Sequence, residues 1–174
     1  MPNHEVRISS FGFHMSTSPF LIGHGYDLHR LQQHGVLMLG GWKVAEGISP
    51  VAHSDGDVVI HALVDAILGA LGRGDIGEHF PDSDPQWKGA ASMRFLDATI
   101  DMAYEMGWSV ANADITILLE RPKLKDHKPN ISSTLSAAVR APVNIKAGTN
   151  EGCDAIGRGE AIAAHAVVLL QRAG

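Results

Sequence analysis

The sequence has little of several residue types, and each shortage excludes a class of protein. A single cysteine among 174 residues excludes an internal disulfide and an all-thiolate metal site, and it fits a reducing compartment. No apolar run is long enough to predict a membrane-spanning helix. The 14 basic residues are outnumbered by 19 acidic ones, giving a net charge of −5, so we expect no nucleic-acid partner.

The remaining composition is typical of one globular domain. Hydrophobic residues make up 45% of the chain and charged residues 19%, which argues against disorder. We find no internal repeat, low-complexity tract or linker. Residues 1–18 lack both a periodic pattern and the apolar segment of a secretory signal, so we expect a flexible extension there and a single domain over 19–174.

The chain is organised around residues 52–65, where a polar cluster runs into a helical pattern over 54–71. Ser54 or Asp55 is the expected helix cap. Asp57, His61 and Asp65 follow at four-residue spacing and therefore share one strip of the helix. This spacing predicts that one ring nitrogen of His61 is available to a metal while an acid holds the other. The alternative is a solvated polar face.

A second pair of candidate ligands precedes that helix. Residues 20–26 predict a short strand ending in Asp27-Leu28-His29, in which residues 27 and 29 point to the same side. Together with His61 they form an Asp-His-His set, typical of zinc sites that keep one position open. The same set suits non-haem iron, so it does not fix the metal. Without His61, a polar loop would be the better explanation of the pair.

The pattern of the whole chain predicts a mixed α/β (α+β) domain with a sheet on one side and helices on the other. After the strand at 20–26, we expect a pair of strands about the Gly40-Gly41 turn. The further expected strands are 112–119 and 142–147, and the further expected helices are 89–106, 130–141 and 157–172.

Two loops carry further candidate residues. In the Gly/Asp/Pro-rich loop 72–85, Asp75 is placed to accept hydrogen bonds from ligand hydroxyls, whereas Asp82 and Asp84 are either ligand contacts or turn formers. The basic loop 120–129 is either a solvated connector or a binding site for a phosphorylated ligand.

These motifs occur in an order that resembles the 2-C-methyl-D-erythritol 2,4-cyclodiphosphate synthase family, from about residue 22 to residue 170. They are Asp27-Leu-His29, His53-Ser-Asp-Gly-Asp-Val-Val-Ile-His61, Gly74-Asp-Ile-Gly77, Phe80-Pro-Asp-Ser-Asp-Pro85 and Arg121-Pro-Lys123. The resemblance implies zinc, or another divalent transition metal, at Asp27, His29 and His61. It implies magnesium or manganese, held with substrate phosphates, at Glu151.

The resemblance also implies residue roles. His53 and Thr149 are the expected catalytic residues, acting as hydrogen-bond donors to phosphate oxygens. The remaining expected substrate-binding residues are Ser54, Asp75, Ile76, Gly77, Phe80, Pro81, Asp82, Ser83, Asp84, Leu119, Glu120, Arg121, Pro122, Lys123, Leu124, Lys125, Gly148, Asn150 and Arg158. The resemblance implies that the loop 119–125 binds the cytosine, so we refer to it as the cytosine loop.

The implied reaction converts 4-diphosphocytidyl-2-C-methyl-D-erythritol 2-phosphate to 2-C-methyl-D-erythritol 2,4-cyclodiphosphate with release of CMP. The 2-phosphate attacks the β-phosphate, so positioning and charge neutralisation replace a protein nucleophile. The implied partners are this CDP-linked small molecule and two further copies of the chain, in a homotrimer with interfacial active sites. The implied location is a bacterial cytoplasm, with the plastid stroma as the alternative.

The chain departs from the family pattern at two places. Gly148 replaces a threonine, which removes one hydroxyl near the phosphates, and Ala155 and Ile156 replace an aromatic residue and a threonine. In the family, the segment that contains residues 155 and 156 is linked to binding of a prenyl diphosphate, and the resemblance does not extend to such binding in this chain. Two rival functions stay open from the residues alone: a zinc hydrolase with Asp65 or Asp55 as general base, and a non-catalytic trimeric module that binds nucleotide or metal.

Overall fold

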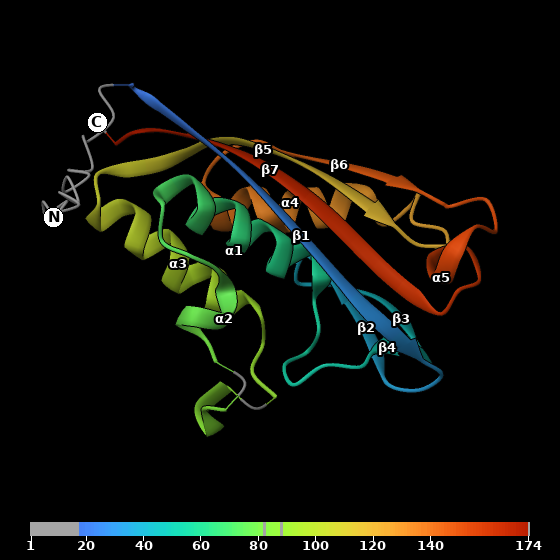
Figure 1. The fold of residues 1–174 in the computed structure, drawn as a ribbon. Helices are drawn as coiled ribbons and strands as arrows, with labels where there is room; N and C mark the ends of the chain where they lie inside the picture. The colour runs from blue at the N-terminus through green and yellow to red at the C-terminus, as the bar shows by residue number, and fades with distance from the viewer. Residues whose placement is uncertain (1–17, 82, 88, 174) are drawn as a thin grey trace, which may run out of the picture.

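The computed structural model describes residues 18–81, 83–87 and 89–173 (Figure 1). The predicted extension therefore lies, except for Ser18, outside the described residues, as does Asp82. The strands are β1 (Phe20–Gln32), β2 (Val36–Leu39), β3 (Trp42–Glu46), β4 (Ser49–Pro50), β5 (Trp108–Leu118), β6 (Val143–Gly148) and β7 (Ala161–Arg172). The helices are α1 (Val58–Leu71), α2 (Ile76–His79), α3 (Met93–Glu105), α4 (Lys128–Val139) and α5 (Asp154–Gly157), with a 3₁₀ turn at Pro85–Trp87.

The main sheet is mixed, with the strand order β4-β1-β7-β5-β6. β5 and β6 are parallel, and the other neighbouring pairs are antiparallel. The three long helices α1, α3 and α4 lie on one side of this sheet (Figure 1), which confirms the predicted arrangement of a single α+β domain. Among the described residues, no helix has the length and apolar character needed to cross a membrane.

The prediction of a helix over 157–172 is wrong, because this segment is the central strand β7. Ile162, Ala164, Ala166 and Val168 are fully buried on the helix-covered face, and Ala161 and Ala163 are buried on the other face against Ile156 of α5. A strand buried on both faces reads as a continuous apolar run without period-two alternation, and its alanines favour a helical interpretation.

The predicted cap of α1 is also wrong, because Asp57 caps it instead of Ser54 or Asp55. The Asp57 side chain is fully buried and accepts hydrogen bonds from the first-turn amides of Val59 and Ile60. It also accepts the amides of Gly40 and Gly41 at 2.8 and 2.7 Å, in the turn between β2 and β3. One carboxylate thus joins the β2–β3 hairpin to the start of α1.

Glycines let α1 approach β1 unusually closely. A Cβ atom on Gly23 would lie 1.8 Å from the carbonyl oxygen of Ala66, and one on Gly25 would lie 1.9 Å from that of Ala62. A glycine in a strand interior often marks such a close backbone approach. The next residue on this face of β1 is Asp27, and His61 precedes Ala62 in α1, so the same contact sets the distance between candidate ligands.

We therefore expect Gly25→Ala to destabilise the fold by about 3 kcal/mol or more, because neither backbone can move without repacking α1. Gly69→Ala is the matched control, since its Cβ would have only the His24 carbonyl oxygen nearby, at 3.9 Å. This control should gain up to about 1 kcal/mol from helix propensity. Urea unfolding of both variants measures the difference, and a Gly25→Ala protein as stable as the wild type would show that the helix is not held at this distance.

Candidate metal site and ligand pockets

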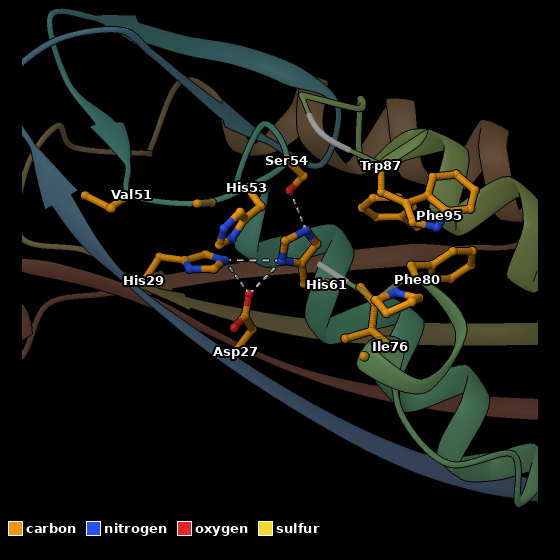
Figure 2. Close-up of a pocket in the computed structure, with 13 residues that line it drawn as sticks. Asp27, His29, Val51, His53, Ser54, His61, Ile76, Phe80, Trp87 and Phe95 are labelled. Atoms are coloured by element: carbon orange, nitrogen blue, oxygen red, sulfur yellow. Dashed lines mark hydrogen bonds and ion pairs between the residues drawn. The ribbon is translucent and has the colours of Figure 1, made fainter. Parts of the chain in front are cut away.

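Three side chains from two elements converge on one point. β1 extends through Asp27 and His29, beyond its predicted end, and it points both toward α1, which carries His61 (Figure 2). Asp27 Oδ2 lies 3.0 Å from His29 Nε2 and 3.0 Å from His61 Nδ1, and the two ring nitrogens are 3.2 Å apart. The sequence-predicted ligand set is therefore assembled in the folded chain.

The geometry of this triangle fits a metal ion. Bonds of about 2.0–2.1 Å in a tetrahedral site place neighbouring ligand atoms about 3.3 Å apart, close to the three observed separations. Hydrogen bonds alone do not account for all three contacts, because two N–H groups directed at Asp27 leave no proton for the contact between the rings. One carboxylate and two imidazoles also form a donor set suited to divalent transition metals.

The charges of the site favour a cation. Burial alone would raise the pKa of the Asp27 carboxyl, but hydrogen bonds and charge from His29 and His61 outweigh it and hold the pKa well below its usual range. Burial alone would lower the pKa of His61, but the hydrogen bond and charge of Asp27 raise it overall. Asp27 is thus ionised at neutral pH and attracts positive charge, which a divalent metal supplies when it displaces protons from the imidazoles.

The other nitrogen of His61 faces hydroxyl groups, and the prediction that an acid on the same helix strip holds it is wrong. His61 Nε2 lies 3.2 Å from Ser54 Oγ and 3.0 Å from Ser92 Oγ. Asp57 is engaged with backbone amides, and Asp65 accepts the amide of Ile76 at 2.7 Å. Helical spacing puts these acids one turn from His61 on the helix. Their carboxylates instead accept hydrogen bonds from backbone amides of other segments.

The candidate metal site opens into a pocket of about 490 Å³ (Figure 2). Several predicted substrate residues line it, namely His53, Ser54, Ile76, Gly77, Phe80 and Pro81. Sequence reasoning missed Val51, Ala52, Trp87 and Phe95, which also line it. The rings of Phe80, Trp87 and Phe95 contact one another, with centroids 4.8 to 5.4 Å apart.

A second pocket, of about 190 Å³, lies where the parallel strands β5 and β6 end. Leu119, Lys123, Leu124 and Lys125 from the predicted cytosine loop line it together with Gly148 and Thr149. Lys128 and Ala147 also line it and were not predicted. Thr149 Oγ1 donates to Glu151 Oε1 at 2.8 Å, so the predicted second metal ligand is tied to this pocket rather than to the first.

The other predicted residues have local partners. Asp75 caps α2 and accepts the amide of Glu78, and Asp84 accepts the amide and side-chain nitrogen of Gln86, as a turn former does. Asn150 donates to Asp154, and Arg158 pairs with Glu160 at 3.0 Å. Ser83, Glu120, Arg121 and Pro122 line neither pocket.

Fold and site together define a class: a one-domain α+β protein whose helix and neighbouring strand hold an Asp-His-His metal-binding group beside a ligand pocket. The chain belongs to the YgbB family, whose profile matches residues 20–171. It is 50% identical over 159 residues to the chloroplastic 2-C-methyl-D-erythritol 2,4-cyclodiphosphate synthase of Arabidopsis thaliana, covering 90% of this chain and 69% of the relative.

Two further comparisons agree. The chain is 47% identical over 152 residues to the 2-C-methyl-D-erythritol 2,4-cyclodiphosphate synthase of Pelobacter propionicus, covering 86% of this chain and 96% of the relative. Among solved structures, the Plasmodium falciparum IspF in complex with CDP is 32% identical with a TM-score of 0.79, covering 91% of this chain and all of that one.

Proposed function

We propose that this chain is a 2-C-methyl-D-erythritol 2,4-cyclodiphosphate synthase of isoprenoid biosynthesis. It would convert 4-diphosphocytidyl-2-C-methyl-D-erythritol 2-phosphate to the cyclic 2,4-diphosphate and CMP. The observation that carries the proposal is the convergence of Asp27, His29 and His61 at the wall of a pocket lined by residues expected to bind this substrate. The curated relatives carry this enzyme's name, and a structural neighbour is described with CDP bound.

The chemistry requires alignment and charge rather than a protein nucleophile. When bound, a divalent metal such as zinc at Asp27, His29 and His61, and a magnesium or manganese ion at Glu151, would supply positive charge to the diphosphate. His53 and Ser54 line the pocket beside the metal-binding group. We propose that they donate hydrogen bonds to phosphate oxygens of the substrate. The rings of Phe80, Trp87 and Phe95 form an apolar wall of this pocket, which would limit the access of water to a bound substrate.

We further propose that each active site combines two subunits. The two pockets share no lining residue, and β7 separates the strand that carries Asp27 from the strands β5 and β6 at whose ends the second pocket lies. A CDP-linked substrate needs both the metal pocket and the cytosine loop. If the metal pocket of one copy meets the cytosine loop of the next, the contact is head-to-tail, and closure after three copies gives the homotrimer that the family resemblance implies.

The sheet provides a surface for this assembly. On the face of β1 and β7 that points away from α1, large apolar side chains are exposed, including Ile22 at 72%, with Phe20, Tyr26, Leu28 and Val167. His24 and His165 lie among these side chains on the same face. Exposure of several large apolar side chains on one sheet face is typical of a contact between copies. We propose that this face packs against the other subunits of the trimer.

The contacts of the candidate bases disfavour the rival hydrolase. That mechanism needs a carboxylate beside the metal to activate water, and Asp55 and Asp65 were the candidates. Asp55 accepts both the amide and the hydroxyl of Ser92, and Asp65 accepts the amide of Ile76. Neither residue lines the metal pocket.

A comparison of two substrates tests the proposal. The protein with magnesium should release CMP from the 2-phosphorylated substrate but not from the same molecule lacking the 2-phosphate, because that molecule lacks the phosphate that attacks in the proposed reaction. Chromatography measures CMP, and addition of a chelator should abolish its release. Equal release from both molecules would show that water attacks, and no release from either would leave a binding module.

We propose either a bacterial cytoplasm or a plastid stroma as the location of the protein. The Arabidopsis relative is named as chloroplastic, whereas the name of the Pelobacter propionicus relative carries no such term. A bacterial cytoplasm and a plastid stroma both fit these names.

A further inference from the structure

Ser92 occupies a cap position without acting as a cap. It precedes α3, where a serine hydroxyl normally accepts an amide of the first turn, and here the side chain makes no such bond. The residue is fully buried. Its hydroxyl instead lies 3.0 Å from His61 Nε2 and donates to Asp55 Oδ1. The capping interaction is thus given up for contacts with a candidate metal ligand.

The direction of these hydrogen bonds determines which nitrogen of His61 carries a proton. A hydroxyl has one proton, and the Ser92 proton is donated to Asp55, so only its oxygen lone pairs face His61. The contact between Ser92 and Nε2 is therefore a hydrogen bond only when Nε2 carries a proton. Nδ1 of a neutral ring is then unprotonated, and Nδ1 is the atom that faces Asp27 and His29.

Asp55 is held firmly enough to define this arrangement. Its carboxylate accepts the amide of Ser92 at 3.1 Å and the amide of Asp57 at 3.2 Å, besides the Ser92 hydroxyl. Its negative charge reaches His61 through the serine, and an acceptor behind a metal-bound imidazole raises the basicity of the ring.

Ser54 is less suited than Ser92 to accept the Nε2 proton of His61. Its hydroxyl lies 3.2 Å from His61 Nε2, but it also accepts the amide of Gly56 and lines the pocket, where substrate is expected. Ser92 is not among the residues that line the pocket. It acts on the reaction only through His61.

We propose that Asp55 and Ser92 form a buried hydrogen-bonded chain that fixes His61 in the tautomer with the proton on Nε2, so that Nδ1 is available to the metal. Ser92 is thereby a positioning residue for the metal site. The inference rests on the metal-binding part of the proposed function and is independent of the reaction catalysed.

Zinc affinity measures the effect without turnover. Titration of metal-free protein against a chelator of known affinity should show Ser92→Ala binding Zn²⁺ about 10–100-fold more weakly than wild type, the usual effect of removing such an outer partner. Ser92→Thr keeps the hydroxyl and should restore affinity to near the wild-type value. Asp55→Asn keeps the shape but loses the charge, and its affinity should fall between those of Ser92→Ala and wild type.

A matched variant separates this effect from loss of stability. Thr99 is equally buried in α3. Its hydroxyl donates to the backbone carbonyl of Phe95 at 2.8 Å and not to a candidate metal ligand. Thr99→Val should lower stability in urea without changing zinc affinity.

Proton exchange at His61 provides a second measurement. In ¹⁵N-histidine-labelled, zinc-loaded protein, the Nε2 proton of His61 should exchange slowly with water in wild type and rapidly in Ser92→Ala.

The outcomes distinguish two failures. If wild type binds zinc and Ser92→Ala binds it equally well with an unchanged Nε2 proton signal, the role of Ser92 is wrong and the metal site stands. If wild type binds no zinc, the metal site and this inference both fail. If Thr99→Val weakened zinc binding as much as Ser92→Ala, the effect of Ser92→Ala would be explained by lost stability, and the inference would be overturned.

Discussion

We expect the replacement of His61 by alanine to abolish metal binding at the Asp27-His29-His61 group and to lower CMP release by more than about 10³-fold. Removal of one hydrogen-bond donor to a transition state typically costs about 10²–10³ in rate. His61→Ala costs more, because it removes one of three ligand atoms that lie within 4.8 Å of one another and leaves the site with two. Metal content per chain and CMP release are the two measurements.

The control is His34→Ala, which changes an exposed histidine in the turn between β1 and β2. This variant should keep both metal and turnover. If His61→Ala retained metal and near-normal turnover, Asp27, His29 and His61 would not be the metal site. Loss of turnover with full metal content would instead assign His61 a role in substrate contact.

Two inactive variants should restore each other's activity when they are mixed. One carries His61→Ala in the metal pocket, and the other carries Thr149→Ala with Glu151→Gln in the second pocket. If each active site joins the metal pocket of one subunit to the cytosine loop of the next, a cyclic trimer that contains both variants has one fully wild-type site among its three. CMP release by assemblies that contain both variants should therefore rise to about a third of the wild-type rate.

The preparation must allow subunits to mix, so the two variants are co-expressed with different tags and purified through both. Variants mixed without exchange serve as the control and should stay inactive. If the co-purified assembly were as inactive as its parents, each subunit would contain both halves of its own site, and the interfacial arrangement would be wrong.

The candidate metal ligands could be predicted from sequence because local geometry brings two of them to one side of a strand. Alternation along a strand puts Asp27 and His29 on one side, and the structure confirms it. Their meeting with His61 needs the close contact of α1 with β1, for which Gly23 and Gly25 were visible but unspecific signals. Ser92 could not be predicted, because it lies 31 residues from His61 and no spacing rule links the two.

The errors have a common physical origin. β7 was predicted as a helix because tertiary burial on both faces erases the alternation that identifies a strand. Asp57 and Asp65 were assigned to His61 because helical spacing is visible in a sequence, whereas the amides of Gly40, Gly41 and Ile76 that bind them come from other segments. Long-range backbone partners decide the role of a buried carboxylate.

The most direct test of the central claim is phosphorus NMR of the products formed from 4-diphosphocytidyl-2-C-methyl-D-erythritol 2-phosphate and magnesium, before and after chelation. We expect CMP together with a cyclic diphosphate, and neither after the metal is removed. CMP together with an open-chain diphosphate would show that water attacks the β-phosphate, and it would contradict the assignment of this chain as a cyclodiphosphate synthase.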